Sequence, residues 1–471
     1  MRLFISVLLV TILAPGLALA RDFYVDPATG SASGDGSMAA PWRTLQEVVA
    51  ANLIETQKWA SLPYVEGASL VPVNPGAPIQ PGDTIWLASG YHGALEILSA
   101  YNAAPITLAA LPDATPEFSS VRFRSADGWV LRGVSVSPSF APTYEAQTAI
   151  DINSHGFSGP SGHITIEGCD VFSVRDISGW SANDWVNLAV NGIASNADDI
   201  TLRDNTLTNV RFGISMSGAR AQVIDNSVRN FSGDGMRGLG DDGLFEHNYV
   251  ANSYDVDDNH DDGFQSWSVG TDGVGSGEVR GMVLRGNMIV NREDPAQALS
   301  GSLQGIGCFD GFFTNWLVEN NVILVDHWHG ITLLGARDSR IVNNTVMDIN
   351  TTDPGPPWIK IAPHKDGTEG TGNLVRNNLA TAIANQGGGI VEDHNLLITD
   401  AAALFVAPTA PWDLHLLMGA EAVDMGAMDS APATDRDGVP RPFGAAVDLG
   451  AYEWTDAPPP VDAGVRDAGS A

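Results

Sequence analysis

An asparagine flanked by short apolar runs recurs through the middle of the chain. The phrases TLRDNTLTNV, VIDNSVRNF, FEHNYVANS, VLRGNMIVN, VENNVILV, IVNNTVMDI and LVRNNLATA align on Asn205, Asn226, Asn248, Asn287, Asn321, Asn344 and Asn378. Successive gaps are 21, 22, 39, 34, 23 and 34 residues, so the unit has 21–23 residues and the longer gaps contain insertions. A repeat of this length predicts a solenoid, in which each unit stacks on the one before it.

Apolar and polar residues alternate within each unit, which is typical of strands with one buried face. A second column, a Gly-Ile-like step, follows at Gly192-Ile193, Gly213-Ile214, Gly235-Met236, Gly263-Phe264, Gly305-Ile306, Gly330-Ile331 and Gly389-Ile390. Several short strands in each unit, separated by Gly, Asn and Asp turns, predict an all-β parallel β-helix over residues 70–400 with coils about 4.8 Å apart. The repeated asparagines are expected to stack as amide ladders, and Val134 and Cys169 fall in the same column further upstream.

The two ends of the chain differ in composition from the repeats. Residues 1–20 have Arg2, an apolar run and a small-residue cleavage site, which predicts a signal peptide and a secreted protein, extracellular or periplasmic. Residues 21–69 should form a strand and a short helix that caps the solenoid, and no later apolar run is long enough to span a membrane. Residues 401–455 form a closing segment, and the Pro/Asp/Ala-rich residues 456–471 are predicted to be a disordered tail or linker.

The charge of the chain limits its partners. The net charge is −32, and the three lysines are Lys58, Lys360 and Lys365. Nucleic acid is therefore not an expected partner, and an anionic polysaccharide would need a bound cation or a local basic cluster to approach. The two cysteines, Cys169 and Cys308, lie several coils apart in the repeat frame and are expected to be buried free thiols. We expect a monomer.

Acidic residues are densest between positions 233 and 267. In the Gly-Ile frame Asp234 and Asp262 occupy the same position of adjacent coils, and stacked carboxylates repel one another unless a cation lies between them. Because Ca²⁺ takes oxygen ligands, we expect a calcium site formed by Asp234, Asp257, Asp258, Asp261 and Asp262. The alternatives are that these aspartates form tight turns, or that they are catalytic carboxylates without a metal.

The same frame predicts a strip of outward-facing side chains beside this cluster: Arg237, Gln265, Trp267, Phe309 and Thr332. The insertions at 268–280, 292–302 and 351–373 should border the strip, and loops above a rigid scaffold often carry function. We expect Gln265, Trp267, Phe309, Trp328, His364 and Arg337 to bind substrate. Lys365 and His329 are the leading candidates for a proton-abstracting base, with Arg237 a third catalytic candidate, although each could instead form a structural turn or salt link.

Segments at the two ends extend the pattern to a known family. FYVDP, PWRTLQ and PGDTIWLASG near the N-terminus, and TDRDGVPRPFGAAVDLGAYEW at 434–454, resemble the entry and closing segments of secreted right-handed parallel β-helix proteins of the pectate-lyase-like superfamily. The resemblance implies a right-handed β-helix. Because that superfamily includes lyases, hydrolases, epimerases and binders, it does not by itself select an activity.

The nearest activity that the resemblance implies is that of calcium-dependent pectate lyases, since Asp261-Asp262-Gly263 and Asp234 are similar to their acidic motif. Calcium would then bind a uronate carboxylate, a base would take the C5 proton, and β-elimination would follow. The chain departs from that motif at Gln265, where a further Asp would be preferred, and it has no lysine between Lys58 and Lys360. A glycoside hydrolase with paired carboxylates, a C5-epimerase and a non-catalytic glycan-binding or adhesin solenoid are the alternatives.

Overall fold

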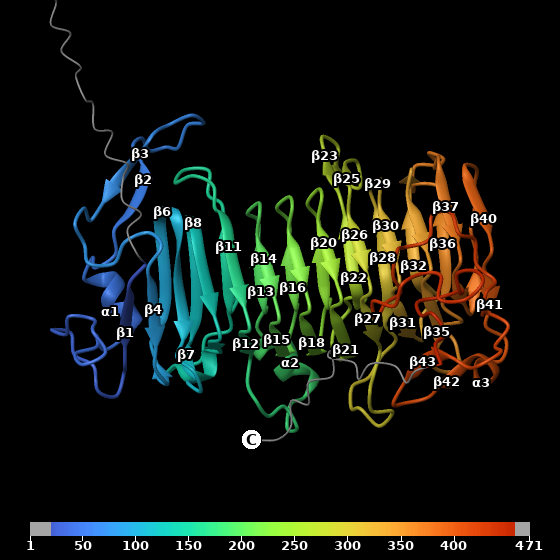
Figure 1. The fold of residues 1–471 in the computed structure, drawn as a ribbon, viewed down its shortest axis with the longest axis horizontal. Coiled ribbons are helices and arrows are strands. Elements are labelled where there is room, and N and C mark those ends of the chain that lie inside the picture. The colour runs from blue at the N-terminus through green and yellow to red at the C-terminus, as the bar shows by residue number, and fades with distance from the viewer. Residues whose placement is uncertain (1–19, 457–471) are drawn as a thin grey trace, which may run out of the picture.

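The computed structural model describes residues 20–456 and forms a solenoid of parallel strands. Figure 1 shows the coils stacked along the long axis, from the blue N-terminal end to the orange and red C-terminal end. A continuous 24-stranded sheet bends within the long strands β6 (Ala94–Ala110) and β8 (Ser120–Arg132), so that it supplies two walls of the solenoid. A 12-stranded sheet supplies the third wall. The predicted all-β parallel β-helix is confirmed.

Each coil contributes one short strand to each wall. Beyond β6 and β8, the first wall consists of β10 (Ile150–Asn153), β13 (Ile193–Ser195), β16 (Ile214–Met216), β19 (Met236–Gly238), β22 (Asp262–Trp267), β28 (Gln304–Asp310), β32 (His329–Leu334), β36 (Trp358–Ala362) and β39 (Ala382–Ile383). The second wall consists of β1 (Asp22–Val25), β4 (Thr84–Leu87), β11 (Gly162–Glu167), β14 (Thr201–Arg203), β17 (Gln222–Ile224), β20 (Leu244–Glu246), β26 (Val283–Arg285), β30 (Leu317–Glu319), β34 (Arg340–Val342), β37 (Asn373–Arg376) and β40 (Ile390–Asp393). The third wall consists of β5 (Gly90–Tyr91), β7 (Pro116–Phe118), β9 (Ser135–Val136), β12 (Asp170–Phe172), β15 (Thr206–Val210), β18 (Ser227–Phe231), β21 (Tyr249–Ser253), β27 (Met288–Val290), β31 (Val322–Val325), β35 (Thr345–Asp348), β38 (Leu379–Ala380) and β41 (Leu396–Leu397).

The repeated asparagines form the predicted ladder at the turn between the second and third walls. Each side-chain amide donates to the side-chain oxygen of the next asparagine at 2.8–3.0 Å, from Asn205 through Asn378 and on to Asn395. Cys169 precedes the ladder in the same column, and its backbone N–H donates to Asn205 at 2.9 Å. The residue before each rung turns the chain with a left-handed φ, as at Asp204 (56°) and Asn320 (56°), which suits short polar side chains.

A ladder asparagine should therefore contribute to stability. Asn226→Ala removes one buried rung and leaves the amide of Asn205 and the side-chain oxygen of Asn248 without that partner. The free energy of unfolding should fall by about 1–3 kcal/mol, as measured by denaturant titration. Asn153→Ala, whose side chain makes no hydrogen bond within residues 20–456, is the control and should change it little. An equal loss in both variants would contradict the ladder's role.

The chain ends cover the solenoid in different ways. Helix α1 (Leu45–Ala50), capped by Thr44, buries Leu45 and Val48 in the main core at the N-terminal end, as predicted. The β-helix does not begin at residue 70, where it was predicted to begin. Strand β3 (Leu70–Val73) instead pairs antiparallel with β2 (Thr56–Trp59) in a hairpin. The first coil strand after the hairpin is β4, and β1 pairs with β4 in parallel.

The C-terminal segment contains α3 (Ala401–Leu404), β42 (Phe405–Ala407) and β43 (Asp413–Leu416). Its apolar residues pack in a second hydrophobic cluster against outward-facing side chains of the third wall, including Tyr249, Leu324 and Leu379. The predicted signal peptide and tail lie outside the described residues, apart from Ala20 and Asp456. Within residues 20–456 no helix is long and apolar enough to cross a membrane. Cys169 and Cys308 are buried free thiols, as predicted.

Two details of the predicted repeat are wrong. Gly389-Ile390 does not continue the Gly-Ile column, because Ile390 pairs with Asn373 in the second wall and Ile383 follows Ile359 in the first. Residues 351–373 are not one insertion, because β36 within them is a regular strand of the first wall. Its alternation of buried Ile359 and Ile361 with Trp358 and Lys360 is the ordinary strand pattern, which the Pro- and Gly-rich flanks obscure in the sequence.

Candidate functional site

The outer face of the first wall carries the predicted strip. Parallel pairing aligns Met236 with Phe264, Ile306 and Ile331 as the buried column. One residue further on, the outward column is Arg237, Gln265, Gly307, Thr332 and Lys360. Phe309 lies at a bulge, since Trp267 pairs with Asp310 rather than with Phe309. The predicted neighbours Arg237, Gln265, Trp267 and Phe309 therefore share one wall.

Asp234 and Asp262 lie where the chain enters this wall, and both side chains have no exposed surface. The Asp234 carboxylate pairs with Nε of Arg237 at 2.5 Å and accepts the backbone N–H of Asp262 at 3.1 Å. Burial is the largest influence on both carboxyls and raises their pKa values, although Arg237 opposes the rise at Asp234 and His260 opposes it at Asp262. The Asp234 carboxylate is thus held by Arg237 and by the backbone amide of Asp262.

His260 projects from the loop before β22 and is held by Asp262. Its Nδ1 lies 3.0 Å from Oδ2 of Asp262, which also accepts Nε2–H of Gln265 at 3.1 Å. The hydrogen bond to Asp262 raises the pKa of His260, and 59% of the imidazole side chain is exposed. Because Nδ1–H donates to the buried acid, the exposed Nε2 of neutral His260 is free to accept a proton.

His329 is held in the opposite tautomer. Its Nδ1 lies 3.0 Å from the hydroxyl of Thr332, which accepts Nε1–H of Trp358 at 3.1 Å. Thr332 is fully buried, and Nδ1 of His329 is the one acceptor among residues 20–456 that its hydroxyl contacts, so its O–H donates to that nitrogen. The ring then has its proton on Nε2 and acts as a hydrogen-bond donor. Burial lowers the pKa of His329 to about 4, which keeps it neutral.

Aromatic rings connect the two histidines. The Phe309 ring centroid lies 6.4 Å from that of His260 and 4.7 Å from that of His329. Trp328, which is 42% exposed, and Trp358 have nearly parallel rings 6.5 Å apart, and the Lys360 ammonium lies 4.9 Å from the Trp358 centroid. The site thus combines a proton acceptor, a neutral donor, a cation and ring faces suited to sugars. We call the set of His260, Asp262, Phe309, His329 and Lys360 the histidine site.

Several predicted site residues lie elsewhere. Lys365 pairs with Asp310 at 2.7 Å beyond the far end of the strands, roughly 15–20 Å from His329 along a strand of this length. His364 and Arg337 both stack on Phe312, at 4.4 and 3.7 Å, at that same far end. The two predicted bases, Lys365 and His329, are therefore not brought together.

The five predicted calcium ligands are also divided. Asp257 pairs with Arg211 at 3.0 Å and Asp258 is exposed, whereas Asp261 accepts hydrogen bonds from Ser253 and Asn259. Within residues 20–456 no three His, Cys, Asp or Glu side chains are grouped to hold a metal ion. Two buried oxygens without partners, Oδ1 of Asp262 and Oε1 of Gln304, fall short of the six or more oxygens that Ca²⁺ takes. These side chains therefore do not fit a calcium site, and calcium binding stays a prediction.

Asp261 offers a test of these buried acids. Burial raises its pKa from 3.8 to about 7. An acid with a higher pKa in the folded chain stabilises the fold fully below its unfolded pKa and loses that contribution as the pH rises through its folded pKa. Between about pH 4 and about pH 8, Asp261→Asn should therefore gain up to about 4 kcal/mol of unfolding free energy relative to the unmodified chain. Urea titrations at several pH values measure this, and a constant difference would contradict the buried, raised-pKa acid.

The sequence did not identify three residues of this site, namely His260, Trp358 and Lys360. His260 lies in a loop that has no counterpart in the other repeats. Its position two residues before Asp262 in the sequence could still have indicated it as a site residue. Trp358 and Lys360 were hidden because their strand was taken as part of an insertion, although WIKIA alternates with a period of two.

Comparisons with known proteins agree with this architecture. A family model described as a right handed beta helix region matches residues 191–395. The crystal structure of pectate lyase Pel9A superposes with a TM-score of 0.50 at 15% identity, covering 93% of this chain and 98% of that one. A rhamnogalacturonan lyase gives a TM-score of 0.33 at 13% identity over 82% of this chain and 91% of that one. The A-module of the mannuronan C-5 epimerase AlgE6 from Azotobacter vinelandii gives 0.37 at 12% identity, over 67% and 90% of the two chains.

No curated protein sequence matches the chain. At these identities the likeness to Pel9A is one of fold, and the chemistry has to be argued from the histidine site itself.

Proposed function

Because this chain is a right-handed parallel β-helix protein, we propose that it acts on a polysaccharide at the histidine site, as a lyase that cleaves a uronate-containing chain by β-elimination. The observation that carries the proposal is His260, an exposed imidazole whose Nδ1 is held by the fully buried Asp262. Such a pair leaves Nε2 as an oriented proton acceptor, which is what removal of a C5 proton requires.

The proposed step uses residues on four successive coils, from β22 to β36. Nε2 of His260 takes the C5 proton of the uronate, and the electron pair forms the C4–C5 double bond. The bond between C4 and the bridging oxygen breaks, and that oxygen takes a proton from water. Lys360 neutralises the uronate carboxylate, and Nε2–H of His329 donates to it as negative charge develops. Phe309, between the two imidazoles, packs against the sugar.

Hydrolysis by the stacked aspartates is less well supported. A glycoside hydrolase needs two carboxyl groups that reach the glycosidic bond from opposite sides. The side chains of Asp234 and Asp262 have no exposed surface, so neither can contact a sugar on the outer face of the wall. Their arrangement instead supports two basic side chains, since Asp234 holds Arg237 and Asp262 holds His260.

The test is incubation with a panel of uronate-containing polysaccharides, with ultraviolet absorbance and reducing ends followed in parallel. A lyase produces an absorbing unsaturated end with each new reducing end. New reducing ends without absorbance would indicate a hydrolase, inverted C5 centres without cleavage an epimerase, and binding without product a glycan-binding solenoid. Repeating the assay with a chelator tests calcium binding, and loss of product there would support the acidic cluster as a calcium site. We further propose that the protein is secreted, where such polymers occur.

A further inference from the structure

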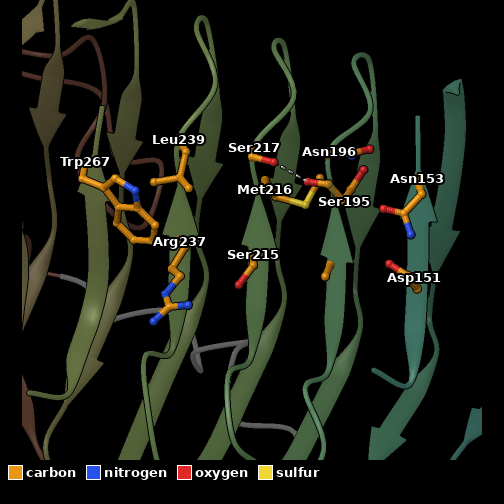
Figure 2. A pocket seen from close by; sticks show the side chains of 11 residues that line it. Asp151, Asn153, Ser195, Asn196, Ser215, Met216, Ser217, Arg237, Leu239 and Trp267 are labelled. Carbon is orange, nitrogen blue, oxygen red and sulfur yellow. Dashed lines mark hydrogen bonds between the residues drawn. The ribbon is translucent and has the colours of Figure 1, made fainter. Parts of the chain in front are cut away.

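The first wall has a groove beside the histidine site. It has a volume of about 260 Å³ and crosses the outer faces of β10, β13, β16, β19 and β22, with Trp267 at one end and Asp151 at the other. Figure 2 shows the lining residues on these successive strands, from Trp267 to Asp151. Four coil steps of about 4.8 Å separate the two ends, or about 19 Å along the helix axis. The groove is therefore elongated across the strands and leads away from His260.

The floor of the groove is uncharged. Ala194 and Ser215 are the outward residues of β13 and β16, and they align with Asp151 and Arg237 in one column. Ser215 makes no side-chain hydrogen bond within residues 20–456, and neither does Asn153 at the far end. Their hydroxyl and amide groups face the groove and are free to bond with a ligand.

The charged groups at the two ends are already paired. Arg237 is bound to the buried Asp234 and lies 3.8 Å from the ring centroid of Phe212 and 5.4 Å from that of Trp267. At the far end, Asp151 lies 3.5 Å from Arg122. No unpaired cation of the groove lining is therefore available for a carboxylate, and Asp151 would repel one.

From this lining we infer that the groove binds uncharged, hydroxyl-rich sugar residues, with Trp267 as the ring on which one of them stacks. The inference rests on the proposed function and gives its substrate class: a heteropolysaccharide in which neutral sugars adjoin the uronate that is cleaved. The polymer lies along the helix axis, with the uronate at His260 and the neutral portion over Ser215.

The test uses two sets of oligosaccharides, one of uronate alone and one in which uronate alternates with a neutral sugar. Ser215→Tyr fills the groove floor, and Gln222→Tyr places the same ring at an exposed position of the same coil on the second wall. Calorimetry on the unmodified chain should give at least tenfold tighter binding of the alternating oligosaccharides. Ser215→Tyr should remove that preference, and Gln222→Tyr should keep it, with thermal unfolding unchanged in both.

Equal or tighter binding of the pure uronate oligosaccharides, or full affinity for alternating ones in a folded Ser215→Tyr variant, would overturn the inference. Failure of this inference about the groove can be distinguished from failure of the proposed lyase function. If alternating oligosaccharides bind in the groove but yield no unsaturated product, the lyase proposal fails and the inference stands. If pure polyuronate is bound as tightly and cleaved as fast as the mixed polymer, the lyase proposal stands and the inference fails.

Discussion

His260→Ala should lower kcat/KM for the proposed elimination by about 10²–10⁴-fold, because it removes the exposed proton acceptor. The effect should fall mainly on kcat, since Phe309, His329 and Lys360 still bind the sugar. Folding should be little affected, because 59% of the His260 side chain is exposed and its contacts with the wall are the hydrogen bond to Asp262 and the ring of Phe309.

A matched control lies on the second wall. His163 pairs with Asp127 at 2.8 Å and is 71% exposed, so like His260 it is an exposed histidine bound to an aspartate, but it lies outside the histidine site. His163→Ala should leave kcat/KM unchanged. Equal rates for His260→Ala and the unmodified chain would remove His260 from the reaction, whatever the activity turns out to be.

Asp262→Asn should lower kcat/KM by about 10²-fold or more and shift its pH dependence. The base must be neutral to accept a proton, so activity should rise with pH through the raised pKa of His260, above the ordinary 6.5. Replacing the carboxylate with an amide removes the largest cause of that raised pKa. The acid limb of the profile should therefore move to lower pH while the maximum rate falls.

The loss of kcat/KM in Asp262→Asn would not reflect unfolding. Burial already raises the pKa of Asp262, and a neutral amide is tolerated at a position where a charge is costly. Circular dichroism and the melting temperature check this. Asp127→Asn, which alters the control pair, should change neither the rate nor the pH profile. An acid limb that stays in place in Asp262→Asn would show that Asp262 does not set the pKa of the catalytic base.

The fold was predictable because its determinants repeat. A rung such as Asn226 has the same partners above and below, so the sequence repeats the same residue wherever the geometry recurs. The same regularity placed Arg237, Gln265, Trp267 and Phe309 on one wall. It failed at Gly389-Ile390, where the glycine precedes a strand of the second wall that begins at Ile390, because a two-residue phrase does not specify a wall.

The site was less predictable because its groups depend on irregular segments. His260 reaches Asp262 from a loop with no counterpart in other coils, so no column could place it. Lys365 was favoured for its rarity in an acidic chain, yet its position beyond the strand end pairs it with Asp310. The tautomer of His329 depends on the burial of Thr332 beneath Trp358, a contact between coils that alternation alone does not reveal.

The central claim is that His260 removes the C5 proton of a uronate on the first wall. The most direct measurement compares kcat/KM for a uronate-containing oligosaccharide with that for the same compound deuterated at C5. The account predicts slower formation of the unsaturated product from the deuterated compound, with the label lost from the new double bond. Cleavage at equal rates, with the label retained and no double bond formed, would contradict it.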